Sequence, residues 1–160
     1  MKLSFKLKHH FFNAFRELFV HHHGSLEFRA KVFALVIAAN ENVKVENYII
    51  VKEIGMQIYN NDEDRANLLM LSTKELVKKI KNNNGVNIDI LINQIQQDLR
   101  FIPRYAKKID VNILRQFLPI SDDQDTTSFQ ENILEFLENL KEEILRSKKT
   151  QIDEDEKRLR

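Results

Sequence analysis

The fold is decided by residues 87–102, which read NIDILINQIQQDLRFI. Apolar side chains recur there every three or four positions, at Ile88, Leu91, Ile92, Ile95, Leu99 and Ile102. This spacing places them on one face of an α-helix and the polar residues on the other. Asn87 has the side chain of a good N-cap. An amphipathic helix must bury its apolar face, so the segment predicts packing against other helices.

A helical period also occurs in residues 9–23, 26–39, 45–59, 64–81, 105–117 and 128–146. The chain contains only three Gly and two Pro, too few for the frequent turns of a β-sandwich or barrel. Its 160 residues suffice for one hydrophobic core. We therefore predict an all-α fold, a single-domain bundle of about six to eight helices.

Further helix starts are indicated by short polar signatures. Ser72 with Glu75, and Ser128 with Glu131, match the capping box, and Asp110 is a third candidate cap. The signature at Ser72 leaves open whether residues 64–81 form one helix or two. The run of residues 82–85, NNNG, predicts a loop because Asn and Gly tolerate the left-handed conformation.

Composition divides the chain into three parts. Residues 1–24 form a basic, Phe-rich segment with the first helix, and residues 25–146 form the main helical domain. Residues 147–160 are dominated by charges without an apolar period, so we expect a solvated, flexible tail there.

Several classes of protein are disfavoured by composition. The chain has no Cys, which excludes disulfides and thiolate metal sites. Its longest apolar run, Val32 to Ala39, is about half the length of a membrane-spanning helix. We therefore expect no transmembrane segment and a cytoplasmic location. The net charge is +1, so any attraction to nucleic acid or anionic lipid must be local.

Residues 33–46, FALVIAANENVKVE, carry a resemblance to a known family. An apolar helix, a polar loop ending in Val43 and a Glu opening the next helix resemble the TerB or DjlA N-terminal-like domains of bacterial stress and tellurite-resistance proteins. Asn40 stands where that family has Asp, Glu41 where it has Gly, and Glu46 falls about one residue early. The resemblance implies a helical bundle, a role in a stress complex or at the inner membrane, and divalent-metal binding in some members.

The N-terminal segment is the first candidate binding surface. It combines basic and aromatic residues: Lys2, Lys6, Lys8, Phe11, Phe12, Phe15 and Phe19. Such a segment can lie on a membrane with Lys toward lipid phosphates and Phe toward acyl chains. It can equally enter a partner's groove, or pack its Phe side chains into the domain's own core.

Two further clusters offer other chemistries. Asp122, Asp123, Asp125 and Glu131 supply oxygen atoms suited to calcium or magnesium, although a solvated acidic loop before a helix explains them equally. Arg100, Arg104, Lys107 and Lys108, with Phe101 and Tyr105 among them, form a basic cluster that could contact nucleic acid, without any known docking motif.

No phosphate loop, nucleophile elbow or zinc-binding helix motif occurs in the sequence. We therefore expect no catalysis and no cofactor beyond a divalent cation. The favoured function is a binding or adaptor module of the bacterial cytoplasm that contacts a protein partner and lies peripherally at the inner membrane. A metal-binding stress protein and a nucleic-acid-binding protein are the alternatives.

Overall fold

The computed structural model describes residues 24–160, and these residues form helices without any strand. The α-helices are α2 (Gly24–Ala38), α3 (Val45–Ile58), α4 (Glu63–Lys81), α5 (Ile88–Phe101), α6 (Val111–Leu114) and α7 (Gln124–Arg158). Two 3-10 helices, η1 (Pro103–Lys108) and η2 (Arg115–Ile120), flank α6. The all-α fold class is confirmed. The predicted helix at residues 9–23 lies outside the described residues.

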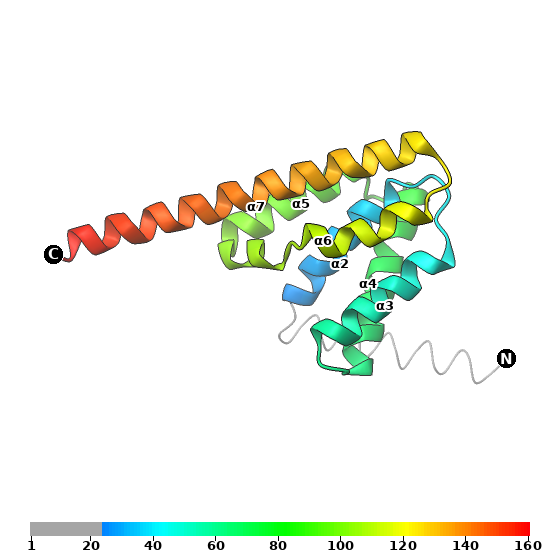
Figure 1. Ribbon diagram of the computed structural model, residues 1–160, viewed down its shortest axis with the longest axis horizontal. Coiled ribbons are helices and arrows are strands. Elements are labelled where there is room, and N and C mark those ends of the chain that lie inside the picture. The colour runs from blue at the N-terminus through cyan, green and yellow to red at the C-terminus, as the bar shows by residue number, and fades with distance from the viewer. Residues whose placement is uncertain (1–23) are drawn as a thin grey trace.

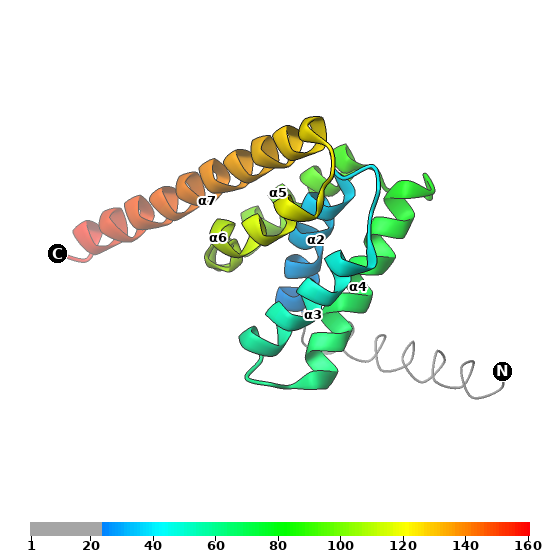
Figure 2. The ribbon, with the colours of Figure 1, turned by 45° about the vertical axis from the view of Figure 1, so that its right-hand side comes forward.

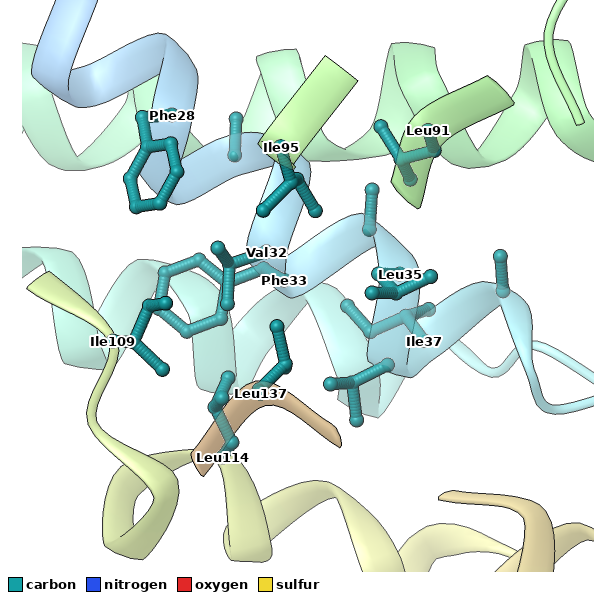
Figure 3. Packing of buried hydrophobic residues seen from close by; sticks show 14 of the residues in the cluster. Phe28, Val32, Phe33, Leu35, Ile37, Leu91, Ile95, Ile109, Leu114 and Leu137 are labelled. Carbon is teal, nitrogen blue, oxygen red and sulfur yellow. The ribbon is translucent and has the colours of Figure 1, made fainter. Parts of the chain in front are cut away.

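Helix α2 is the centre of the bundle. Residues 32–40 are all buried, because α4, α5, α7 and η1 pack around this helix (Figures 1 and 2). Phe28, Val32 and Phe33 of α2 lie among apolar side chains of α5, of α7 and of the region around α6 (Figure 3). A helix that is apolar on nearly all sides is typical of a protein core. Its position explains why residues 32–39 form the longest apolar run of the chain.

Helices α3 and α4 form an antiparallel pair against one side of α2 (Figure 2). They approach closely at Gly55, where an added Cβ atom would lie 2.9 Å from the Cα atom of Ala66. Helix α4 is continuous from Glu63 to Lys81, so residues 64–81 form one helix and not two. The Ser72 hydroxyl donates to the carbonyl of Leu68 one turn earlier instead of capping a new helix.

The predicted caps fall into two groups. Asn87 and Asp110 act as N-caps, since their carboxamide and carboxylate oxygens accept from the backbone N–H groups of Ile90 and Ile113. The predicted start at Ser128 is wrong. Helix α7 begins at Gln124, and its N-cap is Asp123, whose carboxylate accepts from the backbone of Asp125 at 3.1 Å.

Helix α7 differs most from expectation, because it continues to Arg158 through the segment for which we predicted a flexible tail. Opposite charges stand four residues apart there, as in Asp153 with Lys157 and Glu154 with Arg158, and this spacing favours an exposed helix. Residues 149–160 are all exposed, so this part is solvated as predicted but helical (Figure 1). We call residues 146–160 the arm. Within residues 24–160, no helix is both long enough and apolar enough to cross a membrane.

Candidate functional site

The predicted N-terminal surface, Lys2 to Phe19, lies outside the described residues, but the point where it joins the body is described. Gly24, the first residue of α2, lies against Tyr105 of η1: a Cβ atom added at Gly24 would be 2.6 Å from the Tyr105 hydroxyl. The ring of Tyr105 also packs against Phe28, with 5.3 Å between ring centroids. The Arg104 guanidinium lies 5.7 Å from the centre of that same ring. The first described residue, Gly24, therefore lies beside a basic, aromatic segment of the body.

Arg100, Phe101 and Arg104 make up this segment, which we call the basic corner. Helix α5 ends at Phe101 because Pro103 disfavours helical backbone at Ile102, which has φ −134° and ψ 77°. The side chain of Phe101 is 84% exposed, although it follows directly on a core helix. Aromatic residues and Arg are the residue types enriched at protein interfaces, and this corner exposes both.

The two remaining members of the predicted basic cluster line a separate depression, which we call the basic pocket. Its volume is about 160 Å³, and its rim carries Arg29, Lys107 and Lys108. The walls are mostly apolar and come from α2, α3 and α6: Val32, Phe33, Ile58, Ile113 and Leu114. The structure therefore divides the four predicted residues into a corner pair and a pocket pair.

The electrostatics of the basic pocket are unbalanced. Partial burial lowers the pKa of the Lys108 ammonium, and the nearby positive charges of Arg29 and Arg104 lower it further. The rim residues Arg29, Lys107 and Lys108 take part in none of the ion pairs among residues 24–160. The one carboxylate on the rim, Asp110, accepts the backbone N–H of Ile113 as the N-cap of α6. Such a pocket favours an anionic ligand.

Sequence reasoning missed Arg29. It lies 71 or more positions from the basic cluster, and in the sequence it reads as one polar residue at the start of an apolar run. Its guanidinium packs 5.5 Å from the ring centre of Tyr59, at the edge of the same pocket. Only the packing of α2 against η1 brings it to Lys108.

The predicted metal ligands are dispersed. Asp122 forms an ion pair with Lys44 at 2.5 Å, and Asp123 uses its carboxylate as the cap of α7. Asp125 is exposed in the first turn of α7, while Glu131 lies further along the helix and faces a different depression. Between residues 24 and 160 no three His, Cys, Asp or Glu side chains gather in a metal-binding arrangement.

The depression at Glu131 is a wide polar groove of about 610 Å³ between α6 and α7. It is lined by acidic and basic side chains together: Asp110, Arg115, Glu131, Glu135, Glu138 and Lys141. The Lys141 ammonium is already engaged, because it donates to the carbonyl of Ile109 at 2.7 Å. The four carboxylates outnumber the two basic side chains, so the charge of this groove opposes anionic ligands.

The loop that carries the family resemblance is closed by internal hydrogen bonds. The Asn40 side chain accepts the backbone N–H of Asn42, and the Lys81 ammonium donates to the Asn40 carbonyl at 2.6 Å. Partial burial lowers the pKa of Lys81, and the charge of Glu41 partly offsets that effect. A positive charge at this carbonyl opposes binding of a second cation to the loop.

Comparison with known proteins gives no further guide: no family model, curated protein or solved structure matches this chain. The likeness to TerB-like domains stays a prediction from sequence.

Proposed function

We propose that this protein is a non-catalytic binding module that attaches to the surface of an anionic membrane and presents its helical arm to a protein partner. The observation that carries the proposal is the contact between Gly24 and Tyr105. It supports joint action by two basic, aromatic segments that are about 80 positions apart in the sequence. A peripheral position at the inner membrane is also what the resemblance to TerB-like domains implies.

The chemistry of both segments suits a lipid headgroup region. Transfer of one exposed Phe such as Phe101 into an apolar environment contributes roughly 1.5–3 kcal/mol. Each Lys or Arg near an anionic surface adds about 1 kcal/mol. The basic corner provides only one Phe and two Arg, and stable peripheral attachment usually needs two signals. The basic corner and residues 1–20 would supply one signal each.

The test is co-sedimentation of the full chain with vesicles of phosphatidylglycerol and phosphatidylethanolamine, compared with phosphatidylcholine vesicles. We expect binding to the anionic vesicles and a decrease at about 0.5 M NaCl, where the Debye length is only a few ångströms. The double variant Arg100→Glu, Arg104→Glu and the deletion of residues 1–20 should each weaken binding about tenfold or more. Equal binding of all three proteins would contradict the proposal.

Two controls distinguish specific attachment from non-specific adsorption to the vesicles. Phe101→Ser should weaken vesicle binding, whereas Val45→Ser removes an exposed apolar side chain near the other end of the body and should not. Lys78→Glu with Lys79→Glu matches the charge change of the corner variant at an exposed pair on α4. Tight retention of DNA or RNA with no vesicle binding would favour the nucleic-acid alternative and overturn the membrane proposal.

A further inference from the structure

The basic pocket combines a charged rim with walls that belong to the core. Three of the apolar side chains that line it are at most 5% exposed: Val32, Phe33 and Leu114. Core packing therefore holds much of the wall in place. Sites for small molecules generally have this composition, with mostly apolar walls and a few polar groups that fix the orientation of the ligand.

The charge of the rim determines the sign of the ligand. The pKa of Lys108 is lowered by its burial and by the charges of Arg29 and Arg104, so these cations stand close together. Among the described residues that line the pocket, Asp110 is the one carboxylate against three basic side chains. A negative group on this rim relieves the repulsion between the cations. Because Asp110 repels a second negative charge, the rim favours a monoanion over a dianion.

Arg29 is the cation best suited to hold a carboxylate. Its guanidinium packs 5.5 Å from the ring centre of Tyr59, which restricts the orientations open to the side chain. A planar guanidinium can donate two parallel hydrogen bonds to one carboxylate. Lys107 and Lys108 bring ammonium donors to the same rim from η1.

The volume of the pocket limits the apolar part of the ligand. The pocket encloses about 160 Å³. An apolar cavity of about 150 Å³ binds benzene, whereas pockets for drug-sized ligands measure roughly 300–1,000 Å³. An apolar group of about six carbon atoms therefore fits, and a helix or a full acyl chain does not.

We propose that the basic pocket binds a small organic monocarboxylate, with its carboxylate between Arg29 and Lys108 and its apolar group against the walls from α2 and α6. Hexanoate and benzoate are simple members of this class. This inference does not rest on the proposed membrane function, since the basic corner residues do not line the pocket.

The experiment is a titration of the isotope-labelled full chain with hexanoate, followed by NMR of the backbone amides. We expect saturable shifts at residues that line the pocket, with a dissociation constant in about the millimolar range or tighter. Acetate has the carboxylate without the apolar group, and hexylamine has the apolar group with a positive charge. Both should bind at least about tenfold more weakly than hexanoate.

Three variants locate the site. Lys107→Met with Lys108→Met removes two charges from the rim and should weaken hexanoate binding at least about tenfold. Lys78→Met with Lys79→Met makes the same change at an exposed pair on α4 and should leave binding unchanged. Ile113→Phe fills the pocket without altering its charge and should abolish binding.

Circular dichroism and the amide spectrum establish that each variant retains its fold. Hexanoate that shifts no amide of the pocket would overturn the proposal. Acetate that binds as tightly as hexanoate would contradict the role of the apolar walls, and hexylamine that does so would contradict the role of the rim. Vesicle binding is measured separately, so either proposal can fail alone.

Discussion

The Gln130 side chain of α7 donates a hydrogen bond of 3.0 Å to the backbone carbonyl of Val36 in α2, across 94 positions of sequence. Both residues are fully buried. Val36 lies in the last turn of α2, where backbone carbonyls lack partners within the helix. Gln130 therefore supplies a side-chain partner to a helix end inside the core, and so fixes where α7 crosses α2.

Removal of this side chain should destabilise the protein. In Gln130→Ala the buried carbonyl of Val36 loses its partner, and we expect the free energy of unfolding to fall by about 1–3 kcal/mol. Urea denaturation followed by circular dichroism measures the change. Gln97→Ala, at an exposed position on α5, is the matched control and should stay within about 0.5 kcal/mol of the unmodified chain. Similar losses in both variants would contradict the assigned role.

Gly55 should not tolerate a larger side chain. The added Cβ atom of Gly55→Ala would meet the backbone of Ala66 at 2.9 Å, so α3 and α4 would have to separate. Overpacking of this kind costs about 1–3 kcal/mol. Gly85 has φ +79° and open space around it, so Gly85→Asn should cost less because Asn tolerates that conformation. Thermal unfolding distinguishes the two, and an unchanged midpoint in Gly55→Ala would refute the close approach.

The cap of α7 can be tested against the position suggested by sequence. Asp123→Ala should cost about 1 kcal/mol, the usual value of an N-cap. Ser128→Ala should be neutral or slightly stabilising, because Ser128 is exposed within the helix and Ala favours helical backbone. Asp123→Asn keeps a capping oxygen and should behave like the unmodified chain. A larger loss of unfolding free energy in Ser128→Ala than in Asp123→Ala would show that Ser128, and not Asp123, caps the helix.

These residues also illustrate how far local sequence determines the fold. Asn87 and Asp110 were predicted correctly because a cap acts on backbone groups two or three positions away. The capping box at Ser128 has an equally good local pattern. Helix α7 nevertheless begins earlier in the sequence, at Gln124, where Asp123 caps it and Thr126 is buried. The basic pocket could not be predicted, because Arg29 and Lys108 meet only through the packing of α2 with η1.

The pKa of Lys108 should respond to its neighbours. Burial and the charges of Arg29 and Arg104 lower it from 10.5, so the folded chain releases this proton at a lower pH than the unfolded chain. This group therefore destabilises the fold below its folded pKa, and the free energy of unfolding rises as the pH increases from that value to 10.5. Arg29→Gln removes one repulsive charge and should raise the pKa of Lys108. NMR titration of methylated lysines measures the shift. A fall in the pKa of Lys108 would contradict the repulsion between Lys108 and Arg29.

Attachment to a membrane through the basic corner is tested most directly by the orientation of the protein on that membrane. The chain contains no Cys, so a single introduced Cys can be labelled specifically. Nitroxide labels at Phe101→Cys and Val45→Cys report on two ends of the body. Val45 lies near the start of α7, where Lys44 pairs with Asp122. Phe101 lies close to η1, which packs along α7 further toward the arm. With phosphatidylglycerol-containing vesicles, electron paramagnetic resonance should place the label at 101 within the bilayer interface and leave the label at 45 in water. Equal accessibility of both labels to an aqueous relaxation agent would contradict the account.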